Sequence, residues 1–106
     1  MNLGEINMKL LQKILSDSYI KVDKAYIRGS YANNKFNSNS DLDLLIVSSD
    51  FIGIDILKRK EIIKILLKDV IKLKIDSICL TEHEYELVRV DKEKIIKYDE
   101  MVEIIV

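Results

Sequence analysis

The segment DLDLLIV, residues 41–47, restricts the possible folds of this chain more than any other segment. It begins with strict alternation of polar and apolar residues and then becomes apolar at every position. Alternation is typical of a strand with one covered face, whereas a short continuous apolar run is typical of a strand covered on both faces. The segment therefore predicts a strand buried deep in a sheet.

Helical and extended patterns alternate along the rest of the chain. Apolar spacings of three and four residues predict helices over 4–17 and over 53–71, where the stripe is Ile62, Ile63, Leu66, Leu67 and Val70. Strands are expected at 22–28, 41–47 and 72–80, with a polar loop at 30–40. A further helix begins after Thr81, with Glu84 as its capping-box partner, and residues 100–106 fit a short closing strand.

These elements predict the fold class. Helices alternating with strands indicate an α/β (α+β) layer fold, with a mixed sheet of three to four strands flanked by helices. The length of 106 residues, with 48% hydrophobic and 33% charged, is expected to form a single domain over residues 1–106. The chain has no proline and only three glycines, so each glycine is expected where the backbone needs one.

Composition excludes several classes of protein. One cysteine and one histidine exclude an internal disulfide and a Cys/His zinc site. A net charge of −1 argues against a protein whose main role is holding duplex DNA, and no strong nucleic-acid binding is expected. No apolar run approaches the ~20 residues of a membrane span, and the first residues are unlike a secretory signal. A cytoplasmic protein without membrane contact is expected.

Three carboxylates are the candidate metal ligands. Asp41 and Asp43 leave the same face of their strand, about 7 Å apart at the backbone, and can converge on one or two divalent cations. Asp76 lies within KLKIDSICL, and would join them if the two strands are neighbours. Oxygen ligands of this kind suit Mg²⁺. Taken singly, Asp-x-Asp also fits a solvated strand edge, and Asp76 also fits an ion pair with Lys74.

Gly29 and Ser30 form the second candidate element, at the end of the first expected strand. A glycine there allows a ligand to approach the backbone closely, and the serine can donate its N–H and hydroxyl to a phosphate. Alone, the pair is more typical of a simple turn. Combined with the carboxylates it becomes the longer pattern Gly-Ser-x10-Asp-x-Asp, with strands on either side.

In this pattern the sequence resembles the nucleotidyltransferase superfamily that includes DNA polymerase beta and the aminoglycoside nucleotidyltransferases. It is most similar to the minimal nucleotidyltransferases, which are often paired with a HEPN-family protein in toxin–antitoxin modules. The segment YIRGSYANNKFNSNSDLDLLIV carries the likeness, and IDSI supplies the third carboxylate.

The resemblance implies a nucleotidyltransferase that moves a nucleoside monophosphate, AMP from ATP, onto a hydroxyl. It implies that Asp41, Asp43 and Asp76 hold two Mg²⁺ ions, with Asp76 serving the attacking hydroxyl, and that Gly29 and Ser30 bind the phosphates. The implied acceptor is a tyrosine of a HEPN-type helical toxin, which adenylylation would silence. Association of several copies of the chain is left open.

Two other readings stay open. Related sequences often carry Arg-Gly a few residues after Gly-Ser, whereas this chain has Asn33 and Asn34, and the nearby cations Lys35 and Arg28 are each typical of solvated charges. The chain could therefore be a non-catalytic module that neutralises its partner by contact. An aminoglycoside-modifying enzyme is disfavoured, because a chain of this length is expected to hold no second domain for the antibiotic.

The remaining candidate residues are expected to be structural. Cys79 alternates with inward residues of its strand and predicts a small core residue, while His83 lies in a polar run and is expected to be exposed. The five tyrosines are scattered along the chain rather than forming a stacking array for single-stranded nucleic acid.

Overall fold

The computed structural model describes residues 8–32, 35, 37, 40–90 and 101–106. Helices and strands alternate in the expected order, with two short 3₁₀ turns between them. The elements are α1 (Met8–Ser16), β1 (Lys24–Arg28), η1 (Gly29–Tyr31), β2 (Leu42–Val47), η2 (Ser49–Phe51), α2 (Ile56–Leu67), β3 (Ile75–Leu80), α3 (Glu82–Val90) and β4 (Val102–Ile104). None of the described helices is long and apolar enough to cross a membrane.

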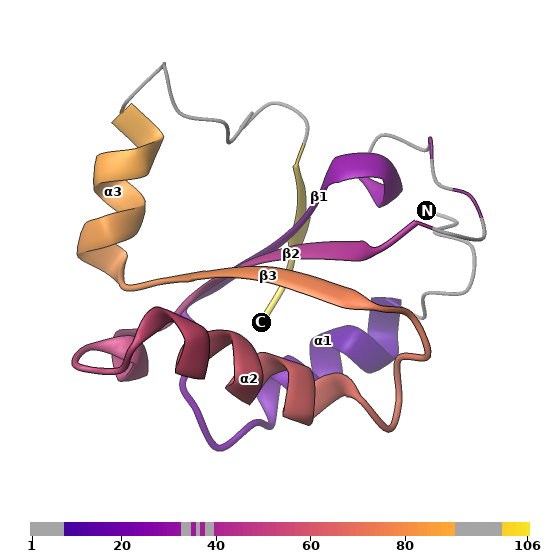
Figure 1. The fold of residues 1–106 in the computed structure, drawn as a ribbon, viewed down its shortest axis with the longest axis horizontal. Coiled ribbons are helices and arrows are strands. Elements are labelled where there is room, and N and C mark those ends of the chain that lie inside the picture. The colour runs from indigo at the N-terminus through magenta and orange to yellow at the C-terminus, as the bar shows by residue number, and fades with distance from the viewer. Residues whose placement is uncertain (1–7, 33–34, 36, 38–39, 91–100) are drawn as a thin grey trace.

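The four strands form one mixed sheet in the order β3-β2-β1-β4 (Figure 1). Strand β2 is parallel to β3, and β1 is antiparallel to both β2 and β4. The expected α/β fold with a mixed sheet is confirmed, and its fourth strand is the one expected near the C-terminus. The segment that predicted a buried strand is β2, which lies inside the sheet with five of its six residues fully buried.

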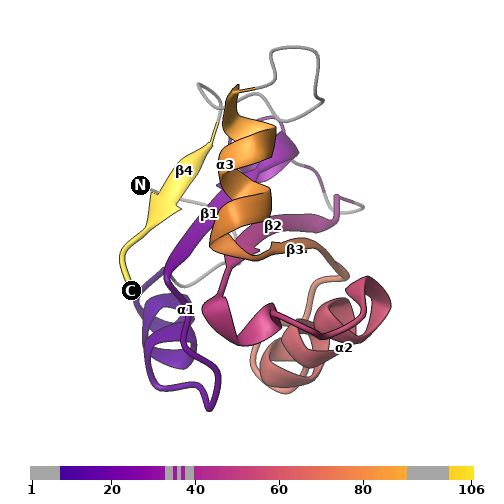
Figure 2. The same ribbon diagram turned by 90° about the vertical axis from the view of Figure 1, so that its left-hand side faces the viewer.

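One face of the sheet packs on α1 and α2, which lie side by side below it in Figures 1 and 2. Alternate residues of β2 point to this side and join the larger core with residues of β1, β3 and both helices. The residues that form its centre are Leu42, Leu44 and Ile46 of β2, Leu11 and Leu15 of α1, and Ile63 and Leu67 of α2.

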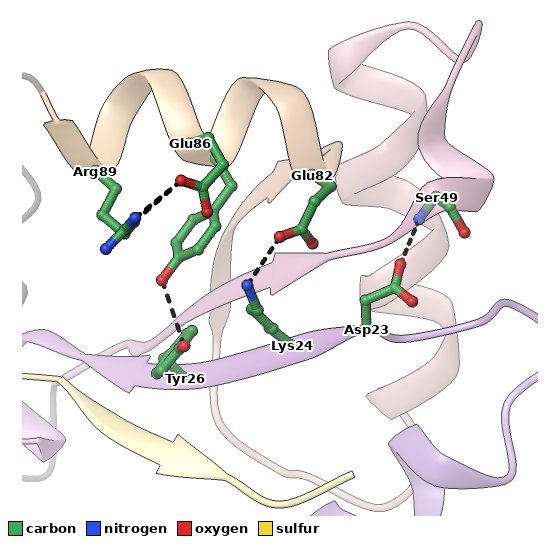
Figure 3. Close-up of polar contacts among 8 residues, drawn as sticks. Asp23, Lys24, Tyr26, Ser49, Glu82, Glu86 and Arg89 are labelled. Carbon is green, nitrogen blue, oxygen red and sulfur yellow. Dashed lines mark hydrogen bonds and ion pairs between the residues drawn. The ribbon is translucent and has the colours of Figure 1, made fainter.

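The opposite face is covered by α3, but only in part. The second core cluster joins Leu45 and Val47 of β2 to Tyr85 of α3, with Ile78 and Leu80 of β3 packed against it. The Tyr85 hydroxyl donates to that of Tyr26 at 3.3 Å. Figure 3 shows this contact beside the ion pair, 2.8 Å long, that joins Lys24 of β1 to Glu82 of α3. These contacts fix α3 over the ends of the strands nearest Leu80.

Several boundaries differ from the prediction, and β1 begins at Lys24 rather than 22 and β2 at Leu42 rather than 41. Helix α2 spans Ile56–Leu67 rather than 53–71, and β3 begins at Ile75 rather than 72. Val70 was predicted on the buried stripe of that helix, which was wrong: its side chain is 38% exposed, because the helix ends before it in a turn. Residues 1–7, which include the start of the first predicted helix, lie outside the described residues.

The predicted capping box at Thr81 is confirmed and has a partner that the sequence did not indicate. The Thr81 amide donates to the Glu84 carboxylate at 2.7 Å, and the Glu84 amide donates to the Thr81 hydroxyl at 3.3 Å. The same carboxylate accepts from the buried guanidinium of Arg59, on α2, at 2.6 Å. Arg59 also donates to the carbonyls of Ile54 and Cys79, so this one side chain joins α2, β3 and α3.

This network gives a test of stability. The amide of Thr81, together with Arg59, lowers the pKa of Glu84. Glu84 therefore stabilises the fold above its ordinary pKa of ~4.3, and that contribution disappears as the pH falls through the lowered value. We expect Glu84→Gln to lose about 1–2 kcal/mol of unfolding free energy at pH 7 and little at pH 3, measured by urea denaturation.

Glu86→Gln is the matched control, because Glu86 makes only an exposed ion pair with Arg89 in the same helix. It is expected to change the free energy of unfolding by less than ~0.5 kcal/mol at either pH. Equal losses of unfolding free energy in the two variants would show that the ion pair between Glu84 and the buried guanidinium of Arg59 does not stabilise the fold.

Candidate active site

The candidate site lies on a row of charged residues across three strands. Arg28 of β1 is the register partner of Asp43 on β2, and Asp43 is the register partner of Asp76 on β3. Residues directly opposite each other share a face of the sheet, so these three side chains leave the face that also carries α3. Of the three carboxylates predicted to lie together, Asp43 and Asp76 are therefore on adjacent strands and on the same side of the sheet.

Helix α3 does not cover this charged row. The next two rows on the same face are Tyr26, Leu45 and Ile78, and then Lys24, Val47 and Leu80. The side chains of these rows pack around Tyr85 of α3 in the second core cluster, or bond to the helix as Lys24 does. The charged row lies beyond them, where β2 and β3 begin and β1 ends. Among the described helices, α3 is the one on this face, and it packs on the other end of the strands.

The turn after β1 is the other wall of the site. Gly29 follows Arg28 directly and has a φ of +70°, a conformation that L residues rarely adopt. A Cβ built on it would overlap the Oδ2 atom of Asp43, so the glycine also makes room for that carboxylate. Ser30 lies within the short turn η1, which packs against β2. The predicted phosphate-binding pair therefore lies directly beside Asp43.

The electrostatics of Asp43 show that the carboxylates are close. Burial raises its pKa most, the charge of Arg28 opposes that shift, and the negative charges of Asp76 and Asp41 raise the pKa further. Asp41 is half-buried immediately before β2, while Asp76 is exposed, with Lys60 Nζ of α2 at 4.0 Å from its Oδ1. A divalent cation would relieve this repulsion, and a set of carboxylate oxygens is what Mg²⁺ prefers.

The side chains do not form a complete metal centre by themselves. Within the described part of the chain, no group of three or more His, Cys, Asp or Glu side chains is arranged to hold a metal ion. The structure thus pairs Asp43 with Asp76 and places Asp41 one residue before the strand. The assignment of all three as metal ligands stays a prediction.

Several other predicted residues can be located. Cys79 is buried, and burial raises the pKa of its thiol, while His83 is exposed, as both were expected to be. Asn33 and Asn34, the positions that depart from the related pattern, lie outside the described residues. Lys60 was missed as a neighbour of Asp76, since no sequence pattern shows how α2 packs beside β3.

Comparison with known proteins decides the family. Residues 8–103 match the family model described as the nucleotidyltransferase domain. The chain belongs to this nucleotidyltransferase family. The match covers most of the chain and confirms the resemblance inferred from residues 26–47. No curated protein matches the chain significantly.

Solved structures with the same fold agree with this assignment. A protein from Sulfolobus solfataricus, provisionally named a nucleotidyltransferase, is 21% identical with a TM-score of 0.53, over 91% of this chain and 73% of that one. A toxin–antitoxin structure with AMP-PNP is 26% identical with a TM-score of 0.56, over 70% of this chain and 57% of that one. A mutant of the toxin–antitoxin pair MntA–HpeT is 23% identical with a TM-score of 0.55, over the same shares. This chain thus spans little more than half the length of the two toxin–antitoxin chains.

The two described glycines, Gly29 and Gly53, both have positive φ and allow a controlled test of the turn beside Asp43. Gly53 has a φ of +79° but nothing within 4 Å of an added Cβ, so Gly53→Ala meets only backbone strain. Gly29→Ala meets similar strain and also the carboxylate. We expect Gly53→Ala to cost about 1 kcal/mol of unfolding free energy and Gly29→Ala about 1–2 kcal/mol more. The excess should shrink when Asp43→Ala is added; an excess that persists would mean that Gly29 does not make room for Asp43.

The raised pKa of Asp43 predicts a gain in stability from removing its charge. The folded protein favours the protonated form, so ionisation destabilises the fold as the pH rises through the raised pKa. Asp43→Asn should therefore increase the melting temperature at pH 7 without ligand, and this gain should vanish near pH 3. Asp17→Asn, at an exposed position on the other side of the fold, is the control and should change little at either pH. Equal behaviour of the two variants would contradict crowding of the carboxylates.

Proposed function

We propose that this protein is a Mg²⁺-dependent nucleotidyltransferase that transfers AMP from ATP onto a hydroxyl group of a protein partner. The observation that carries the proposal is the register pair Asp43 and Asp76, facing the same side beside the Gly29–Ser30 turn. The family of the chain supplies the reaction class, and nucleotidyltransferases of this fold generally use divalent cations.

Each residue has a separate role in this proposal. Gly29 and Ser30 bind the β and γ phosphates, because the glycine permits close approach and the serine offers an N–H and a hydroxyl. Asp41 and Asp43 hold the cations on the nucleotide side. Asp76, which lies on β3, serves the attacking hydroxyl of the acceptor. When bound, two Mg²⁺ ions would align the hydroxyl with the leaving pyrophosphate and offset the developing charge.

The proposed acceptor is a tyrosine of a HEPN-type helical toxin, which adenylylation would inactivate. Support comes from the toxin–antitoxin structure with AMP-PNP, which is 26% identical to this chain. That structure combines a nucleotide analogue with a toxin–antitoxin pair on the same fold, so it supports both the choice of ATP and a protein partner. The chemistry needs only that the partner present its hydroxyl beside Asp76.

Nucleotide binding can be tested by thermal shift. A ligand held only by the folded state stabilises it by about 2.7 kcal/mol at a hundred times its Kd, so Mg²⁺ with ATP should raise the melting temperature by several degrees. Asp41→Asn combined with Asp43→Asn should abolish the shift. Asp17→Asn with Asp69→Asn removes the same charge from exposed positions and should keep it. A full response from the first double variant would place the nucleotide elsewhere.

Measuring AMP transfer distinguishes an enzyme from a non-catalytic module that neutralises its partner by contact alone. Asp76→Ala should leave partner binding nearly unchanged and reduce transfer by orders of magnitude, because Asp76 contributes mainly in the transition state. Intact-mass spectrometry of the co-expressed toxin should show the mass of added AMP with the wild type and none with the variant. If the toxin stays unmodified yet is neutralised equally by both proteins, the contact-only reading is correct.

A further inference from the structure

A groove runs between α2 and the outer edge of β3. It has a volume of about 490 Å³, and its lining includes the consecutive strand residues Ile75, Asp76 and Ser77. Side chains of consecutive strand residues point to opposite faces of the sheet. All three can line one groove only if the groove follows the backbone of β3 along its edge. In the described sheet β3 is an edge strand, with β2 on its other side.

Lysines line this groove at helical spacing. Lys60 and Lys64 lie four residues apart on α2, about 6 Å along the helix axis, and Lys68 is the C-cap residue of the same helix. A neighbouring hollow of about 310 Å³ shares two of them and adds Lys72 and Lys74. The acidic residues lining the two hollows are Glu61 and Asp76. A chain with a net charge of −1 thus concentrates five lysines along one strand edge.

Most of this positive charge is not neutralised within the described chain. Lys60 lies 4.0 Å from Asp76, and Lys72 donates to the carbonyl of Asp69 at 3.2 Å. Lys64, Lys68 and Lys74 form no ion pair with any described carboxylate. An edge with this excess of positive charge is complementary to a partner that carries negative charge along an extended backbone.

The composition of the groove favours a peptide over a nucleic acid. Non-specific single-strand sites combine positive charge with aromatic side chains for base stacking, and here the lining residues that are not charged are Ser77 and the aliphatic Ile65, Ile71, Leu73 and Ile75. The Cys79 carbonyl already accepts from Arg59, so an added strand would pair with the edge of β3 before Cys79, at the residues that line the groove, while flanking side chains select its residues. Aliphatic and lysine side chains together suit a strand in which apolar and acidic residues alternate.

We propose that an extended acidic segment of the protein partner adds to the edge of β3 in this groove. The lining of the groove includes Asp76, which also belongs to the charged row of the candidate active site. A segment paired with β3 would therefore lead its chain toward the carboxylates. This inference deepens the proposed function and rests on it for the identity of the acceptor, whereas the binding itself can be measured without any transfer.

The direct test uses a labelled peptide of alternating glutamate and valine, with binding followed by fluorescence anisotropy. The full chain should bind the peptide, and Lys64→Glu with Lys68→Glu should weaken binding at least about tenfold. Both positions are exposed, so the fold should tolerate the change. Methylating alternate backbone amides of the peptide should weaken binding similarly, because these groups pair with the strand edge.

The control variant is Lys13→Glu with Lys58→Glu, which makes the same charge change at exposed positions outside the groove. It should bind the peptide like the wild type. Equal losses in both double variants, or none in either, would overturn the proposal. The proposal would also be overturned if a labelled oligouridylate bound more tightly than the peptide and the variant with Lys64→Glu and Lys68→Glu lost that binding. The groove would then be a nucleic-acid site.

Nucleotide response separates this inference from the proposed function. The variant with Lys64→Glu and Lys68→Glu should still show the rise in melting temperature with Mg²⁺ and ATP but should no longer bind the peptide. The variant with Asp41→Asn and Asp43→Asn should still bind the peptide but should show no rise in melting temperature. If the wild type binds the peptide but shows no response to nucleotide, the groove proposal stands and the proposed reaction fails.

Discussion

The register between β2 and β3 determines most of what this molecule can do. Alternation in β2 directs Leu42 and Leu44 into the core, so a slip by one residue would bury Asp43 and expose the leucines. The correct register places Asp43 opposite Asp76, although like charges in this position destabilise a sheet. The fold therefore keeps two mutually repelling carboxylates together because its core allows no other pairing.

Helix α3 divides the face that carries these carboxylates. Its Tyr85 fills the apolar end, where burial and the bond from Tyr85 raise the pKa of Tyr26 to about 12 and keep it neutral. The capping box and Arg59 fix where the helix begins, and so determine how far along the strands it reaches. Helix α3 therefore leaves the charged end of the face uncovered, beside the Gly29 turn that is proposed to bind phosphate. Apolar packing and the proposed active site thus lie at opposite ends of one face of the sheet.

Sequence reasoning succeeded where a pattern is local. The buried strand from Asp41 and the capping box at Thr81 follow from local spacings, and Gly29 was expected at the end of a strand. The family was inferred from the resemblance of residues 26–47. Features that depend on tertiary contacts could not be found this way. Arg28 opposite Asp43 requires the antiparallel register, and Lys60 beside Asp76 requires the position of α2. The burial of Arg59 depends on its contacts with β3 and α3, which no local pattern of α2 indicates.

The lysines along β3 also affect whether identical chains can pair edge to edge. An open strand edge is a template for pairing between identical chains, and charged side chains along it are a common protection against aggregation. Lys72 and Lys74 precede this strand, and Lys64 of α2 and its C-cap residue Lys68 lie beside it. Two copies brought edge to edge would oppose their own positive charges. The lysines proposed to select an acidic partner would therefore also hinder pairing between identical chains, and substitutions that neutralise them would remove that protection.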